Sequence, residues 1–207
     1  MALQKIGIVG AGLIGGNLAR LFTQAGHQVL LSFSRAPQKL RTLTQELGSN
    51  AQAGTPAEAA AFGDIIVLSV HFAALDAALA QTGNLQGKIL IDTNNPFDIT
   101  LPPGVSGAQE IARRLPGAHI VKAFNTQGYT VLLEKSFATP RLVMPLAGDD
   151  AAKDVVASLI VAAGFEPFDL GNLAEAHLQE PNGPFYNKAL DRAHAQTLLA
   201  AYSTTRR

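Results

Sequence analysis

The chain has 207 residues, of which 47% are apolar, and its 16 basic side chains equal its 16 acidic ones. This balance argues against a nucleic-acid-binding surface, which normally shows a basic excess. The absence of cysteine excludes disulfides, a thiolate nucleophile and cysteine metal ligands. The length suits one domain with a sizeable core.

The apolar N-terminus predicts a strand rather than a signal peptide, because it lacks a charged region followed by a cleavage site. The longest apolar stretch, residues 65–75, is interrupted by Ser69 and His71 and is too short to cross a bilayer. We therefore expect a cytoplasmic protein that binds neither membranes nor nucleic acid.

Apolar runs alternate with helical patterns along the whole chain. The predicted strands are Lys5–Val9, Gln28–Phe33, Asn50–Ala53, Ile65–Val70, Lys88–Asp92, His119–Phe124, Leu142–Leu146 and Glu166–Asp169. The predicted helices are Leu13–Ala25, Pro37–Leu47, Pro56–Phe62, Ala73–Ala80, Ala108–Leu115, Ala151–Ala163 and Asn187–Tyr202. Strands such as DIIVLSV are continuously apolar, as in sheets covered on both faces. This pattern predicts an α/β fold with a doubly wound, mostly parallel sheet.

The first strand runs directly into Gly10-x-Gly12-x-x-Gly15, and a helical pattern follows. This is the fingerprint of a dinucleotide site: Gly10 permits a tight turn, Gly12 lets a pyrophosphate approach the backbone, and Gly15 lets the helix pack against the strand. The free N–H groups at the start of the helix would face the phosphates. A purely structural glycine turn is the alternative.

The end of the second strand indicates which dinucleotide is bound. An NAD site has a carboxylate about 20 residues beyond the glycines, but this chain has no Asp or Glu between Gly16 and Gln45. Ser34 and Arg35 stand there instead, with Lys39 close behind. A hydroxyl and a guanidinium would bind the 2′-phosphate of NADP(H); the alternative is a solvated basic helix start. We expect a Rossmann-type NADP-binding domain over residues 1–171, with a C-terminal loop and helix over 172–207 packed on it.

Ligands of open parallel sheets lie beyond the carboxyl ends of the strands. Asparagines there can bind a nicotinamide carboxamide or ribose without adding charge, although Asn95-Pro96 also suits a simple turn. His71 suits a general acid, but a histidine that only contacts the cofactor or solvent fits better. Lys122 lies in a predicted strand with an alternating pattern, so the end of its side chain is expected to reach a helix edge or solvent. Asp92 ends the preceding predicted strand and is expected to cap the turn that follows. The residues expected to contact the cofactor are Gly10, Ala11, Gly12, Leu13, Ile14, Gly15, Ser34, Arg35, Lys39, Ser69, Val70, His71, Asn95, Ala123 and Asn125.

No pair of carboxylates stands out for acid/base chemistry, and the sequence contains no nucleophile elbow or metal signature, so we predict no catalytic side chain and no metal site. Direct hydride transfer suits a protein without recognisable catalytic side chains, since the cofactor then carries the chemistry and the protein supplies alignment.

On these residues the chain resembles the F420-dependent NADP oxidoreductase family over nearly its whole length. The matching pieces are IGIVGAGLIGGNLA at 6–19, Ser34-Arg35, VKAFNT at 121–126, PLAGDD at 145–150 and Glu180-Pro181. The resemblance implies that NADPH binds at the glycine loop, with its 2′-phosphate on Ser34 and Arg35. It also implies hydride transfer to a stacked deazaflavin, F420, without an obligatory protein acid or base. Ferric-reductase domains of certain membrane metalloreductases look similar and use a flavin, FMN or FAD, instead.

Two functional classes follow. The first is an NADP(H)-dependent oxidoreductase acting on a small-molecule acceptor, either a flavin-like ring or a small carbonyl or imine. The second is a non-catalytic NADP(H)-binding redox sensor. The chain lacks the extra helical domain with which many dehydrogenases build a substrate pocket, which leaves room for a homodimer whose second subunit completes the crevice.

Overall fold

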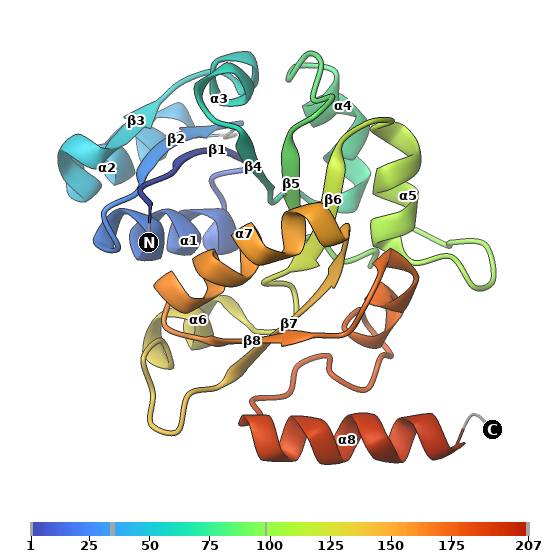
Figure 1. Cartoon of the computed structure of the whole chain (residues 1–207). Helices are drawn as coiled ribbons and strands as arrows, with labels where there is room; N and C mark the ends of the chain where they lie inside the picture. Colours follow the sequence, from blue (N-terminus) through green and yellow to red (C-terminus); the bar gives the residue numbers. More distant parts are fainter. Residues whose placement is uncertain (1, 34–35, 98, 206–207) are drawn as a thin grey trace.

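The computed structural model describes residues 2–33, 36–97 and 99–205, and in that part of the chain one sheet of eight strands forms the centre of the molecule (Figure 1). The strands are β1 (Lys5–Val9), β2 (Gln28–Ser32), β3 (Ala51–Ala53), β4 (Ile65–Leu68), β5 (Ile89–Asp92), β6 (His119–Ala123), β7 (Val143–Gly148) and β8 (Glu166–Asp169). Their order across the sheet is β3-β2-β1-β4-β5-β6-β7-β8. The order reverses at β1, which places the β1–β4 boundary at the switch point where such folds bind ligands.

Helices connect the strands. They are α1 (Leu13–Gln24), α2 (Pro37–Leu47), α3 (Pro56–Phe62), α4 (Leu75–Leu79), α5 (Gly107–Arg114), α6 (Tyr129–Glu134), α7 (Asp150–Ala162) and α8 (Arg192–Thr205), with 3-10 turns η1 (Gly48–Asn50), η2 (Phe72–Ala74) and η3 (Leu173–Leu178). Several begin as their sequence predicts. Thr55 and Glu58 form a reciprocal capping box at α3, and Ser106 and Gln109 form one at α5.

The sheet is buried on both faces. One face packs against α1, α2, α6 and α7, with Leu18, Phe22, Leu132, Val156 and Leu159 in its core. The other face packs against α3, α4 and α5. All four residues of β4 are buried, as expected for a covered central strand. The predicted doubly wound α/β fold is therefore confirmed.

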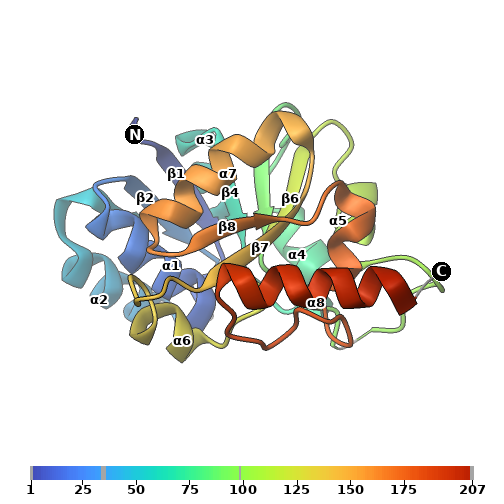
Figure 2. The ribbon, with the colours of Figure 1, turned by 60° about the horizontal axis from the view of Figure 1, so that its bottom comes forward.

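Strand β7 runs antiparallel to β6, whereas every other neighbouring pair is parallel. As a result, the carboxyl ends of β7 and β8 lie at the opposite edge of the sheet from those of β1 to β6. Helix α8 lies outside the sheet beside β7 and β8 (Figure 2). Its Ala195 is buried with Val143 and Phe168.

Two predictions about the C-terminal half are wrong in detail. The last helix begins at Arg192 rather than Asn187, because Asn187 adopts a left-handed φ of 54° and Asp191 accepts a hydrogen bond from the His194 N–H at 2.9 Å. Asp191 thus caps the N-terminus of the helix. The prediction also missed helix α6, whose short apolar stretch carries no side-chain cap.

No described helix combines the length and the apolar character that a membrane span requires.

Candidate functional site

The turn between β1 and α1 is tight, and two glycines are sterically required, one in this turn and one in the first turn of α1. Gly10 has a φ of +109°, and a Cβ there would lie 2.0 Å from the Ser69 carbonyl oxygen of the neighbouring strand end. A Cβ on Gly15 would lie 2.0 Å from the Gly10 carbonyl oxygen. The chain itself therefore requires these two glycines, whether or not a ligand is bound.

Gly12 differs from both. It is the N-cap of α1, no side chain caps the helix there, and a Cβ on Gly12 would meet no atom within 4 Å. The first turn of α1 contains no acidic residue. The free N–H groups and the positive end of the helix dipole are thus accessible beside an exposed glycine, which is the arrangement that binds phosphate. The residues around this helix start are exposed or half-buried: Ala11, Leu13 and Ile14.

Strands β1 and β2 are parallel neighbours, so the turn after β2 lies next to the start of α1, which follows β1. Ser34 and Arg35 fall outside the described residues, so their predicted contacts remain predictions. Helix α2 follows with Pro37 in its first turn and no acidic side chain there. Lys39 is exposed on that turn. The described part of this region is thus free of carboxylates that would repel a 2′-phosphate.

The loops after β4, β5 and β6 meet at one edge of the sheet. The Val70 N–H donates to Asn94 Oδ1 at 2.7 Å, which joins the first loop to the second. Asn95 Nδ2 donates to the Asn125 carbonyl oxygen at 3.0 Å, and Asn125 Nδ2 donates to Asn95 Oδ1 at 2.9 Å. This reciprocal pair joins the second loop to the third. His71 is exposed next to Val70, Ser69 is half-buried, and Ala123 is buried at the end of β6.

The orientation of the Asn125 amide follows from its neighbours. Its Nδ2 group has two acceptors, Asn95 Oδ1 and the Gln179 carbonyl oxygen at 2.7 Å. The amide oxygen must therefore lie on the other side. Asn125 Oδ1 is buried and accepts no hydrogen bond from any described residue. A buried acceptor in this state costs about 1–3 kcal/mol until a donor reaches it.

Lys122 corrects the sequence prediction, since its side chain reaches neither solvent nor a helix edge. It is wholly buried, and its Nζ lies 2.9 Å from Asp92 Oδ2 and 3.0 Å from Glu180 Oε1. Asp92 does cap the following turn, as predicted, by accepting from the Asn94 N–H, but it also pairs with Lys122. Sequence reasoning missed Glu180 as a partner, because nothing local links a C-terminal loop to a strand far earlier in the chain.

Burial and charge shift the pKa values of this cluster. Burial raises the pKa of Asp92 above its usual range, although Lys122 opposes the effect. For Lys122, burial alone would lower the pKa, but the two carboxylates outweigh burial and raise it. Lys122 therefore stays protonated at neutral pH and cannot act as an amine nucleophile.

Exposed apolar side chains surround the same edge. Leu13 follows β1, Phe97 follows β5, and Tyr129 follows β6; they are 63%, 64% and 46% exposed. The Phe97 ring contacts that of Tyr186 edge-on, with centroids 6.1 Å apart. Such a group of exposed apolar side chains is typical of a binding surface.

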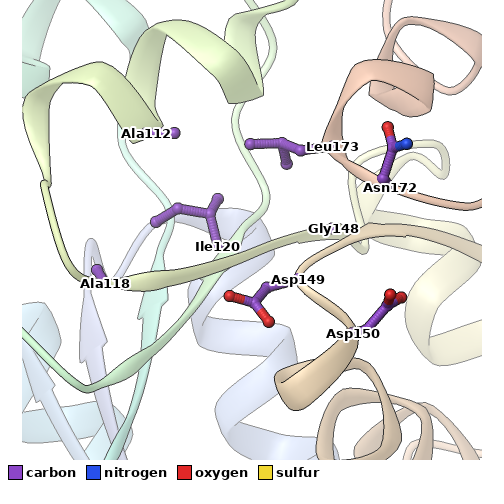
Figure 3. A pocket seen from close by; sticks show the side chains of 8 residues that line it. All are labelled: Ala112, Ala118, Ile120, Gly148, Asp149, Asp150, Asn172 and Leu173. Atoms are coloured by element: carbon purple, nitrogen blue, oxygen red, sulfur yellow. The ribbon is translucent and has the colours of Figure 1, made fainter.

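A hollow of about 450 Å³ lies at the edge of the sheet opposite the loops after β4, β5 and β6, beside the start of β6 and the end of β7 (Figure 3). Asp149, Asp150 and Asn172 line it together with apolar side chains. Asp149 already binds His119 Nδ1 at 2.7 Å and caps α7. Two carboxylates and a capped helix suit no phosphate group, so we do not place the nucleotide there. Among the described residues, no group of three or more His, Asp or Glu side chains is placed to hold a metal ion.

Comparison with known proteins agrees with this geometry. The family model described as NADP oxidoreductase coenzyme F420-dependent matches residues 5–96. The chain is 31% identical over 173 residues to the metalloreductase STEAP3 of Rattus norvegicus; the match covers 83% of this chain and 35% of that protein, so the chain spans about a third of its relative.

Two solved structures cover nearly the whole chain. One is a hypothetical protein from Sinorhizobium meliloti, with a TM-score of 0.79 and 30% identity over 92% of this chain and 96% of that one. The other is provisionally described as an F420-dependent NADP-reductase from Arthrobacter sp. FB24, with a TM-score of 0.72 and 25% identity over 98% and 93%. Residues 5–96 therefore match the family of NADP oxidoreductases described as coenzyme F420-dependent, and the whole chain shares its fold with a structure provisionally described as such a reductase.

Proposed function

We propose that the chain binds NADPH along the edge of the sheet formed by the carboxyl ends of β1 to β6. The observation that carries this proposal is the start of α1, where Gly12 leaves uncapped N–H groups accessible. The pyrophosphate lies there in our proposal, because these N–H groups supply the donors that it needs. The helix dipole adds a favourable field for the negative charge.

The adenosine end extends toward the turn after β2. The absence of acidic side chains in the described part of this turn favours NADPH over NADH, and Ser34 and Arg35 would bind the 2′-phosphate. The structure does not describe these two residues, so this part of the proposal depends on their identity and on their place in the sequence.

The nicotinamide end lies beside Asn95 and Asn125. The unpartnered Asn125 Oδ1 is an acceptor for a carboxamide N–H group. Both asparagines are uncharged, so they do not repel a positively charged nicotinamide ring. NADPH supplies the hydride when bound; these side chains bind and orient the ring. We assign no protein acid or base to the transfer.

We propose that the hydride acceptor is a planar ring, either a deazaflavin or a flavin. The exposed side chains of Leu13, Phe97 and Tyr129 offer an apolar surface at the nicotinamide edge. A flat aromatic ring would bury this surface and gain stacking contacts with Phe97 and Tyr129.

Stopped-flow oxidation of NADPH by the purified protein, with F420, FMN and FAD as acceptors, tests this function. We expect single-turnover transfer to at least one ring, and binding of NADPH at least tenfold tighter than that of NADH. Tight NADPH binding without transfer to any ring, or to a small imine or carbonyl tested in parallel, would contradict the oxidoreductase proposal and favour a redox sensor. Transfer to a small imine or carbonyl alone would contradict the planar acceptor.

A matched pair of variants locates the acceptor. We expect Phe97→Ser to raise the KM for the accepting ring about tenfold, because it removes the largest exposed apolar side chain beyond β5. Phe137→Ser is the control, since Phe137 is 51% exposed but lies in the connection between α6 and β7. Equal KM changes in the two variants would contradict an acceptor at Phe97.

A further inference from the structure

The buried charge cluster formed by Asp92, Lys122 and Glu180 lies directly behind the loop that carries Asn125. Lys122 and Asp92 are fully buried, and the Glu180 side chain is 6% exposed. Lys122 also donates to the Asn94 carbonyl oxygen. One ammonium group therefore connects β5, β6 and a residue from the C-terminal part of the chain.

Glu180 has a second set of partners that offsets the excess negative charge. Its Oε2 accepts from the Gly107 N–H at 2.8 Å and its Oε1 from the Ala108 N–H at 3.0 Å. These are first-turn donors of α5, where the helix dipole is positive. A Cβ on Gly107 would lie 3.2 Å from Glu180 Oε1, so a larger residue would press against the carboxylate. Glu180 thus caps α5 from a distance and pairs with Lys122.

The residues next to Glu180 hold the loop after β6. The Gln179 carbonyl oxygen accepts from Asn125 Nδ2, and Gln179 Nε2 donates to the Lys122 carbonyl oxygen at 3.2 Å. Farther along, the Asn187 N–H donates to the Thr126 carbonyl oxygen at 2.9 Å, and Gln127 Nε2 donates to the Lys188 carbonyl oxygen at 2.7 Å. We call residues 179–188 the C-terminal clamp, because four hydrogen bonds tie them to residues 122–127.

We propose that Glu180 is a positioning residue: through Lys122 and the C-terminal clamp it fixes Asn125 and so sets the nicotinamide end of the NADPH site. This inference rests on the proposed function. The pyrophosphate end contains none of these contacts, since Gly12 and α1 lie on the other side of the switch point. Loss of the Glu180 carboxylate is therefore expected to disturb ring alignment and to leave phosphate binding nearly intact. A disturbed ring slows hydride transfer, because the transfer depends on the alignment of the reacting atoms.

Glu180→Gln tests the proposal, because it removes the charge and keeps nearly the same shape. Glu110→Gln is the matched control: it makes the same change on α5, in an ion pair with Arg113 and Arg114 that does not touch the clamp. In the nucleotide-free protein, we expect Glu180→Gln to speed amide hydrogen exchange at least fivefold in residues 122–128 and 179–188, but not in residues 10–24. Glu110→Gln is expected to change neither region.

Binding and transfer are then measured on the same proteins. For Glu180→Gln we expect an NADPH Kd within threefold of the unsubstituted protein, altered fluorescence of the bound nicotinamide, and hydride transfer about fivefold slower, which is no more than the loss expected for Asn125→Ala. Uniformly faster exchange across the chain, or unchanged exchange and fluorescence, would overturn the proposal. Failure of the unsubstituted protein to bind NADPH would refute the proposed function, while the exchange measurement would still report on the clamp.

A milder variant guards against misfolding of Glu180→Gln. Gln179→Met removes only the hydrogen bond from Nε2 to the Lys122 carbonyl oxygen and leaves the charge cluster intact. We expect a change in the same direction, about twofold to threefold in both exchange and transfer. An effect on Kd alone would contradict a positioning role.

Discussion

The two ends of the proposed nucleotide site are built in different ways. The phosphate end is one continuous piece of chain, in which Gly10 lies in the turn after β1, Gly12 is the N-cap of α1, and Gly15 lies in the first turn of that helix. The nicotinamide end is assembled from three strand ends and a C-terminal segment, held by the Asn95–Asn125 pair and by Glu180. The first can be recognised from a short sequence motif, whereas the second exists only after the chain has folded.

This difference has an energetic consequence. The phosphate end relies on backbone N–H groups and a helix dipole, which most side-chain substitutions leave unchanged. The nicotinamide end depends on buried polar side chains that satisfy one another, so removal of one member leaves its partners unpaired. Variants at the two ends are therefore expected to separate binding from transfer.

The largest effect is expected at the phosphate end. Gly12→Val should leave a folded protein, because a Cβ there meets no atom within 4 Å, but its side chain would occupy the path of the pyrophosphate. We expect NADPH binding to weaken more than 100-fold by calorimetry, with an unchanged Tm. Tight NADPH binding to the folded variant would show that this turn is not the phosphate site.

Gly15→Val, three residues away, should behave in the opposite way. Its Cβ would lie 2.0 Å from the Gly10 carbonyl oxygen, so the helix would have to move away from the strand. We expect a loss of about 3 kcal/mol or more in the free energy of unfolding, measured by urea denaturation. A Tm like that of Gly12→Val would contradict this steric argument.

The next effect concerns cofactor choice. Each charge-assisted hydrogen bond to a 2′-phosphate contributes about 1.5–3 kcal/mol, so Arg35→Glu should weaken NADPH binding at least about tenfold. NADH binding should change much less. Arg141→Glu is the control, because it makes the same charge change at an exposed position just before β7. Equal affinity of the unsubstituted protein for the two cofactors would remove the basis of this prediction.

A smaller effect is expected on the rate of transfer. His71→Ala, Asn95→Ala and Asn125→Ala should each lower turnover by less than about tenfold, because none is assigned a proton-transfer role. Positioned proton transfer is worth about 10²–10⁴-fold. A loss on that scale in His71→Ala, at unchanged NADPH affinity in stopped-flow measurements, would favour a carbonyl or imine reductase.

Much of the fold could be predicted, because its signals are local. Continuous apolar runs marked the strands, and Thr55 and Ser106 marked two helix starts that the structure confirms. The reversal of β7 could not be predicted, since an apolar run has no direction. The predicted start of α8 at Asn187 was wrong, because the helical pattern alone does not mark the first residue and Asp191 makes the capping bond.

The candidate site likewise has features that could be predicted from the sequence and features that could not. The steric need for Gly10 and Gly15 could be predicted from spacing alone, and the structure gives the contacts that explain it. The buried pairing of Lys122 with Asp92 and Glu180 could not, because a lysine in an alternating strand more often reaches solvent. Only tertiary folding brings the three charges together. The cofactor contacts predicted for the strand ends stay predictions.

The smallest expected effect concerns pH, and it lies outside both ends of the site. His27 is buried before β2; its Nδ1 accepts from the Gln4 N–H at 3.1 Å, and its Nε2 has no partner among the described residues. Burial therefore lowers the pKa of His27 below its ordinary value of 6.5. The neutral ring stabilises the fold above pH 6.5, and this contribution is lost as the pH falls below 6.5 toward the folded-state pKa. The loss cannot exceed about 1.4 kcal/mol per pH unit for one proton.

Urea denaturation at pH 7.5 and 5.5 measures this loss, and His27→Gln provides the comparison because glutamine does not titrate. We expect the unsubstituted protein to lose more stability over this interval than His27→Gln. Asp92 cannot mimic the result: burial raises its pKa, so any contribution from that carboxyl group weakens with rising rather than falling pH. Equal losses in the two proteins would show that His27 is not the titrating group. If the losses differ as expected, a pH-dependent fall in hydride transfer that persists in His27→Gln originates in a titratable group other than His27.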